Sequence, residues 1–145
     1  SDKNPKNLND ILGISGRLVK SGKDVIIAGE IVYGGSQHVA TAVIEMNKKF
    51  PYVLSGINLK FNTKVISKAK QLGMIIFRYD RKKEPKKIKN KENSSIAWGI
   101  SNIIKKEAPD LIYHNGDIGK EPMILIFGTN PDDVIKKVSK LRLNY

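Results

Sequence analysis

Short apolar runs alternate along this chain with segments whose apolar residues recur at helical spacing, and this alternation restricts the fold more than any other feature. The run 74–79 starts with nearly continuous apolar residues, which predicts a strand buried on both faces. The segment 94–107 opens on two serines, either of which can cap a helix, and stops before Pro109. Strands alternating with helices over most of a chain predict a three-layer α/β/α domain.

The same patterns place the other elements. A strand or a bent pair of short strands is predicted over 25–33, because Ala28-Gly29 interrupts that apolar run. Further strands are predicted over 56–61, 111–113 and 123–127, and further helices over 38–49 and 62–72.

The last helix has the clearest start, because Asn130 is a capping residue and Pro131 suits the first helical position. Its expected buried face consists of Val134, Ile135, Val138 and Leu141. Residues 1–10 are polar and are predicted to be a linker or tail, so the single domain is expected to cover 11–145. The segment Arg81–Lys91 contains six lysines and is predicted to be a solvated loop.

Composition removes several classes of site. The chain has no cysteine, which excludes disulfides, thiol nucleophiles, zinc ribbons and iron–sulfur clusters and fits a reducing compartment such as the cytoplasm. Its two histidines are too few for a histidine-rich metal site. No apolar run approaches the 18 or so residues of a membrane span. The 145 residues carry a net charge of +12, which predicts an anionic partner: nucleic acid, a membrane or a phosphorylated small molecule.

Gly34-Gly35-Ser36 links a predicted strand to the predicted helix that contains His38 in its first turn. Backbone N–H groups of such a loop can converge on an anion at the helix start, and Ser36 can cap the helix. The loop lacks the lysine of a Walker motif and the third glycine of a dinucleotide-binding fingerprint. An ordinary strand-to-helix turn therefore remains the alternative interpretation.

A second candidate is the loop 116–122, in which Asp117, Lys120 and Glu121 lie within a few residues of each other. Two carboxylates beside a lysine can hold magnesium and a phosphate oxygen together, although a solvated connection with incidental charges is the alternative. Arginine is scarce: 22 of the 26 basic residues are lysine. Because the guanidinium group is the preferred diphosphate clamp, Arg17 and Arg81 become candidate ligands. His114 is expected to be a partly exposed histidine at a strand end.

Several of these motifs together resemble the archaeal-type thiamine-phosphate synthase domain, the ThiN family. The resemblance runs from about Pro5 to Leu141, and its most specific motif is Gly119-Lys120-Glu121-Pro122. The other carrying motifs, in order, are 16–19, 34–40, 57–61, 79–85, 97–100, 109–113 and 116–118.

The resemblance implies a transferase that condenses hydroxymethylpyrimidine diphosphate with hydroxyethylthiazole phosphate, giving thiamine phosphate and pyrophosphate. It implies the mixed sheet of the class II aldolase-like group without that group's zinc histidines. It also implies that this domain lies C-terminal to a covalently linked hydroxymethylpyrimidine or phosphomethylpyrimidine kinase domain. The family's functional arginine and histidine fall on Arg17 and His38.

We therefore predict catalytic roles for Arg17 and His38. Substrate or diphosphate binding is predicted for Gly35, Ser36, Asn58, Arg81 and Lys120. Asp117 and Glu121 are the predicted ligands of Mg²⁺, and no organic cofactor is expected. His114-Asn115 departs from the usual family pattern, so neither residue receives a role.

Two other functions compete with synthesis. A domain of the same fold, fused to a helix-turn-helix regulator, would sense a thiamine precursor instead of making thiamine phosphate. A nucleic-acid binder would fit the net charge, but only 7% of the residues are aromatic and the lysines are scattered. We expect phosphorylated small molecules and no membrane as partners, and leave open whether the chain forms a homo-oligomer.

Overall fold

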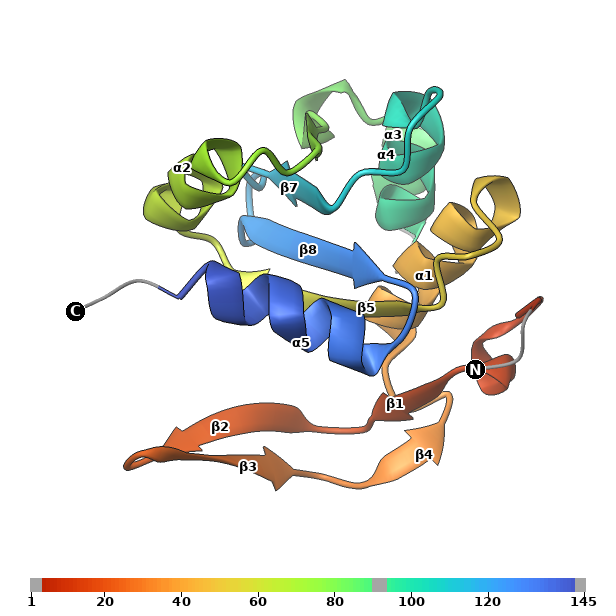
Figure 1. Ribbon diagram of the computed structural model, residues 1–145. Coiled ribbons are helices and arrows are strands. Elements are labelled where there is room, and N and C mark those ends of the chain that lie inside the picture. Colours follow the sequence, from red (N-terminus) through yellow and green to blue (C-terminus); the bar gives the residue numbers. More distant parts are fainter. Residues whose placement is uncertain (1–3, 90–93, 143–145) are drawn as a thin grey trace.

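A four-stranded mixed sheet forms the centre of the computed structural model, which describes residues 4–89 and 94–142 (Figure 1). The strand order is β5-β8-β7-β6. The strands are β5 (Ser55–Lys60), β6 (Ile76–Arg78), β7 (Leu111–His114) and β8 (Met123–Gly128). β6 and β7 are parallel, whereas β5 with β8 and β7 with β8 are antiparallel. The expected mixed sheet is therefore present.

Helices cover both faces of this sheet. Helices α1 (Gln37–Lys49) and α4 (Ser94–Ile103) pack on the face that carries Ile112, Leu125 and Phe127. Helices α2 (Thr63–Gln71) and α5 (Pro131–Lys140) pack on the opposite face. Neighbouring strand residues point to opposite faces, so Leu111, Ile124 and Ile126 belong to this second core. The three-layer arrangement predicted from the alternation is observed.

Position in the sheet explains where the predicted burial was wrong. The run 74–79 forms only the short edge strand β6, in which Ile76 and Phe77 are half-buried and Arg78 is exposed. Residues of the central strand β8 are almost all buried instead. In α5, Ile135 is 60% exposed because it lies one residue away from the buried face defined by Val134 and Leu141.

A long two-stranded hairpin precedes the sheet and lies apart from it in Figure 1. Each of its two arms is divided into two short strands. The first arm contains β1 (Leu12–Ile14) and β2 (Arg17–Ser21), and the second contains β3 (Asp24–Ala28) and β4 (Ile31–Tyr33). β1 pairs with β4, and β2 pairs with β3. We call residues 12–33 the β-ribbon. The predicted bent pair over 25–33 is confirmed, with its bend at Gly29, whose φ of 144° favours glycine. The first half of the hairpin was not predicted.

Two segments expected to be irregular contain short helices. Residues 8–10 form a 3-10 turn in which Asn7 and Asp10 cap each other, and Leu8 packs against the core, so this part of the expected tail has a place in the fold. The lysine-rich segment contains a 3-10 turn at Arg81–Lys83 and the short helix α3 (Lys86–Lys89). Arg81 is buried, so the prediction of a wholly solvated loop was wrong there. Asn90 and Lys91 lie outside the described residues.

Helix α4 ends at Ile103, four residues earlier than predicted. No helix in the described part of the chain is long and apolar enough to cross a lipid bilayer.

Candidate active site

Five buried polar residues gather where the parallel strands β6 and β7 end. His114 is the last residue of β7, Tyr79 and Arg81 follow β6 directly, and Glu84 and Ser95 complete the group. We call these five residues the polar cluster. His114 and Tyr79 lie on the α1/α4 side of the sheet, because His114 is two residues after Ile112 and Tyr79 belongs to the same core. Ligands of α/β proteins bind outside the carboxyl ends of strands, so this is the expected place for a site.

His114 is the most buried member, with 1% of its surface exposed, which corrects the expectation of a partly exposed histidine. The backbone N–H of Gly116 donates a hydrogen bond to its Nδ1 at 3.0 Å. A neutral ring that accepts at Nδ1 carries its proton on Nε2. Nε2 is buried and has no hydrogen-bond partner within the described residues. His114 therefore keeps a buried N–H donor available.

The charge state of His114 follows from its surroundings. Burial is the main cause that lowers the pKa of His114 to about 4, and the nearby Arg81 and His38 lower it further. The ring is thus neutral at pH 7. The same effect shows that His38, from the first turn of α1, lies close to the polar cluster.

Tyr79 lies beside His114, with their ring centroids 5.0 Å apart. Burial raises the pKa of Tyr79, an effect partly opposed by Arg81, so the hydroxyl stays protonated. Its oxygen also lacks a hydrogen-bond partner within the described chain. A Cβ atom on Gly99 would lie 2.6 Å from carbon atoms of the Tyr79 ring, so α4 needs glycine there for the ring to pack.

Arg81 and Glu84 form a buried pair, with Nε of the arginine 3.7 Å from Oε2 of the glutamate. Asp80 caps the short turn that begins at Arg81, and this turn brings the two side chains together at a spacing of three residues. The arginine Nε and the glutamate Oε1 make no hydrogen bond among the described residues. Removing two charges from water costs several kcal/mol per ion. Buried charged groups whose hydrogen-bonding atoms are not all paired are typical of functional sites.

Lys120 reaches this cluster from the loop that follows β7. Its Nζ lies 3.5 Å from the Oγ of Ser95 at the start of α4. The loop is closed by two backbone hydrogen bonds between Asp117 and Lys120, of 3.1 and 2.9 Å. Gly116 has a φ of 78°, and a Cβ atom there would lie 2.4 Å from the Lys120 carbonyl oxygen. The structure thus brings together His38, Arg81 and Lys120 from the predicted set.

The glycine loop before α1 has the predicted position at a helix start. Gly35 approaches the β-ribbon so closely that a Cβ atom would lie 2.5 Å from the carbonyl oxygen of Gly13. Ser36 occupies the N-cap position, but its side chain makes no capping hydrogen bond, so the predicted side-chain cap was wrong.

Other predicted residues lie outside the polar cluster. Arg17 is exposed on β2 of the β-ribbon. Asn58 is exposed on the edge strand β5, opposite Leu125 and therefore on the α1/α4 side. Asp117 is half-buried and Glu121 is exposed. Among the described residues, no group of three or more His, Asp and Glu side chains could hold a metal ion.

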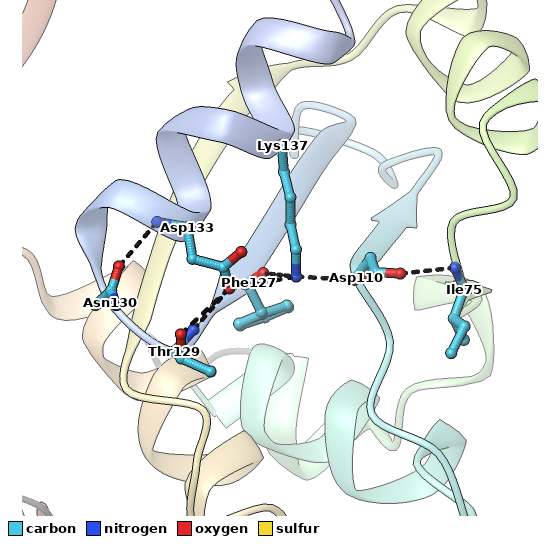
Figure 2. Close-up of polar contacts among 7 residues, drawn as sticks. All are labelled: Ile75, Asp110, Phe127, Thr129, Asn130, Asp133 and Lys137. Carbon is cyan, nitrogen blue, oxygen red and sulfur yellow. Dashed lines mark hydrogen bonds and ion pairs between the residues drawn. The ribbon is translucent and has the colours of Figure 1, made fainter.

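A second polar group lies at the other end of β7 (Figure 2). Lys137 forms ion pairs with Asp110 at 2.8 Å and with Asp133 at 3.7 Å, and donates a hydrogen bond to the carbonyl oxygen of Phe127 at 2.8 Å. Asp110 also accepts from the backbone N–H of Ile75, and Asp133 from that of Thr129, each at 2.9 Å. We call Asp110, Asp133 and Lys137 the Lys137 cluster. Its carboxylates tie α5 and the 73–75 connection to the sheet.

The fold and the polar cluster define an α/β domain with cationic and neutral donors at the carboxyl ends of its parallel strands. The chain matches the model of the family described as thiamine-phosphate synthase ThiN over residues 1–140. It belongs to this family.

Curated relatives agree with the family. The chain is 32% identical over 144 residues to thiamine-phosphate synthase ThiN of Methanothermobacter thermautotrophicus, covering 98% of this chain and 76% of that protein. It is 31% identical to the bifunctional thiamine biosynthesis protein ThiDN of Methanocaldococcus jannaschii, covering 97% of this chain but 33% of that protein. The crystal structure of the C-terminal domain of a phosphomethylpyrimidine kinase superposes with a TM-score of 0.84 at 41% identity, covering 94% of this chain and 78% of that chain.

Sequence reasoning missed four members of the polar cluster: Tyr79, Glu84, Ser95 and His114. One signal was available, since Glu84 follows Arg81 at the three-residue spacing that pairs charges on one helical turn. Nothing in the sequence marks the burial of His114, because a strand-end histidine is buried or exposed according to what packs over it.

Proposed function

We propose that this chain condenses hydroxymethylpyrimidine diphosphate with hydroxyethylthiazole phosphate, giving thiamine phosphate and pyrophosphate. The observation that carries the proposal is the polar cluster: buried, incompletely hydrogen-bonded groups beside His38 and Lys120, in a chain of the ThiN family. The proposed bond changes are simple. The thiazole nitrogen attacks the methylene carbon on the pyrimidine, the bond from that carbon to the diphosphate oxygen breaks, and pyrophosphate takes the electron pair.

Negative charge grows on the leaving diphosphate in this reaction, so the barrier depends on donors placed to receive it. We assign Lys120, Arg81 and the Gly35–Ser36 backbone to the diphosphate, with His38 donating to it or protonating it. His114 adds an N–H donor, and its ring does not take up a proton at pH 7. Arg17 is a further proposed diphosphate ligand and Asn58 a second-rank pyrimidine or phosphate contact. Both lie outside the polar cluster, so their roles rest on the family motif.

Magnesium is kept as a separate proposal. The described residues offer no set of three carboxylate or histidine ligands, so Mg²⁺ would depend on diphosphate oxygens for most of its coordination. Asp117 and Glu121 are the side chains proposed to orient it. Titration of the activity with MgCl₂ after treatment with a chelator tests this, and full activity without divalent cations would refute it.

We also propose that the fold belongs to the class II aldolase-like group and that the full-length protein carries a linked kinase domain. The mixed sheet between two helical layers supports the first proposal. The ThiDN relative, of which this chain covers 33%, supports the second. Superposition on a zinc-dependent aldolase of that group tests the topology, and the sequence upstream of Ser1 tests the linkage.

The reaction is tested by incubating the purified chain with both substrates and measuring thiamine phosphate and pyrophosphate. The proposal expects the two products in equal amounts and saturation by each substrate. Binding of either substrate without product formation would instead identify a sensing domain. Lys106→Ala serves as the control and is expected to keep full activity, because this exposed lysine lies beyond the C-terminal end of α4, whereas Ser95 of the polar cluster lies at the start of that helix.

A further inference from the structure

The β-ribbon exposes large apolar side chains on both of its faces. Leu18 lies opposite Ile27, and Val19 lies opposite Ile26, in the β2–β3 pairing. Since successive strand residues point to opposite sides, each pair occupies a different face. The exposed fractions of the four side chains range from 36% for Val19 to 50% for Ile26.

A hairpin of this kind needs a partner. An isolated two-stranded ribbon is at best marginally stable in water, and soluble monomers rarely expose apolar patches beyond a few hundred Å². The apolar surface continues along the ribbon toward its base. Exposed side chains there are Leu12, Ile31, Val32 and Tyr33. Such an exposed apolar surface is typical of a site of protein–protein contact.

Its size and charge fit a second copy of the same chain. The ribbon has 22 residues, a number within the roughly 20–30 residues per side of a standard stable interface. The ribbon contains three basic residues, Arg17, Lys20 and Lys23, and two acidic ones, Asp24 and Glu30, so it contributes +1 to the net charge of +12. Two identical chains of that charge repel each other, and the repulsion is weakest where they meet through nearly neutral surfaces.

A linked kinase domain is the other candidate partner. However, this chain covers 76% of the ThiN relative, which leaves little room for a kinase domain in that protein. A second copy is therefore the partner that a protein of this family can supply with or without a linked kinase domain. We propose that the β-ribbons of two copies pack against each other in a two-fold symmetric dimer, in which the same surface of each copy forms the contact. This inference concerns assembly and does not depend on the proposed reaction.

The first test is sedimentation equilibrium of the purified chain at micromolar concentration. We expect a dimer of twice the 16.2 kDa chain mass. The variant Leu18→Glu/Ile27→Lys keeps the net charge and places an ion pair across the hairpin, while removing the apolar pair on one face. Four apolar side chains are lost per dimer, so the dissociation constant should rise by more than about 100-fold. Ile135→Glu, at a 60% exposed isoleucine on α5, is the matched control and should stay dimeric.

Cross-linking provides a second readout that keeps the apolar side chains. Because the chain has no cysteine, a bifunctional maleimide should link the Lys20→Cys variant covalently into dimers and should leave Lys136→Cys, on α5, without a covalent link between copies. A monomeric wild-type chain would overturn the proposal. So would a dimer that the ribbon substitutions leave intact, because the contact would then lie elsewhere. If circular dichroism shows that the double variant is unfolded, the cross-linking yields of the two cysteine variants test the proposal in its place.

Discussion

The two ends of β7 carry polar groups of opposite character. Asp110, just before the strand, belongs to the Lys137 cluster, in which ion pairs and backbone hydrogen bonds satisfy partly exposed side chains (Figure 2). His114, the last residue of the strand, belongs to the polar cluster, whose members are buried and keep four polar atoms without hydrogen-bond partners among the described residues. The Lys137 cluster is structural, because its charged groups are paired with each other and with the backbone. The polar cluster is a candidate ligand site, because it contains buried polar atoms without hydrogen-bond partners among the described residues.

The largest expected effect is on stability at the polar cluster. Glu84→Ala leaves the Arg81 charge buried without its partner, so the free energy of unfolding should fall by about 3–5 kcal/mol. Urea denaturation measures this change. Arg81→Met/Glu84→Leu removes both charges and should recover most of the stability without recovering the synthase activity. An active double variant would contradict the assignment of Arg81 to the substrate.

Lys120→Ala should separate activity from stability at the same site. Loss of one donor to the developing charge lowers kcat by on the order of 10²–10³. The side chain's contact with Ser95 is long, at 3.5 Å, so the melting temperature should change little. Steady-state kinetics and thermal denaturation of the variant and of Lys106→Ala give the two readouts. A normal kcat would remove Lys120 from the mechanism.

The pH dependence of stability tests the environment of His114. Its pKa is about 4 in the folded chain against an ordinary 6.5, so the unfolded chain binds the proton more readily. Stability should therefore fall as the pH drops from 6.5 toward 4, by up to about 3 kcal/mol. His114→Gln should remove this part of the pH dependence, and the difference between variant and wild type separates it from carboxylate titration. Parallel curves for the two proteins would mean that the histidine is not buried as described.

The smallest effect is expected at the Lys137 cluster. Lys137→Met removes two ion pairs between partly exposed side chains, so the free energy of unfolding should fall by about 1 kcal/mol. Synthase activity should stay unchanged, since the cluster lies at the opposite end of β7 from the polar cluster. A large loss of activity with unchanged stability would show that the Lys137 cluster also acts in the reaction, and the functional contrast between the two clusters would then be wrong.

Most helices and strands were predictable, because local sequence patterns determine where such elements begin and end. Asn130 and Pro131 set the start of α5, and the bend at Gly29 divides the strands β3 and β4. The first half of the β-ribbon was missed although Ser21-Gly22-Lys23-Asp24, between two apolar runs, is a hairpin signal; the structure shows Gly22 with a φ of 60° in that turn. The edge position of β6 could not be predicted, since strand order depends on contacts between distant segments.

By itself, the sequence determined the alternation of strands and helices, the absence of cysteine chemistry and the family motifs that contain His38, Arg81 and Lys120. Only the tertiary structure decided which of these residues meet. The parallel pairing of β6 with β7 brings residues 79–84 beside His114, and the packing of α1 and α4 adds His38 and Ser95. The physical reason is burial: a side chain's partners, its pKa and its need for a ligand depend on neighbours that are remote along the chain.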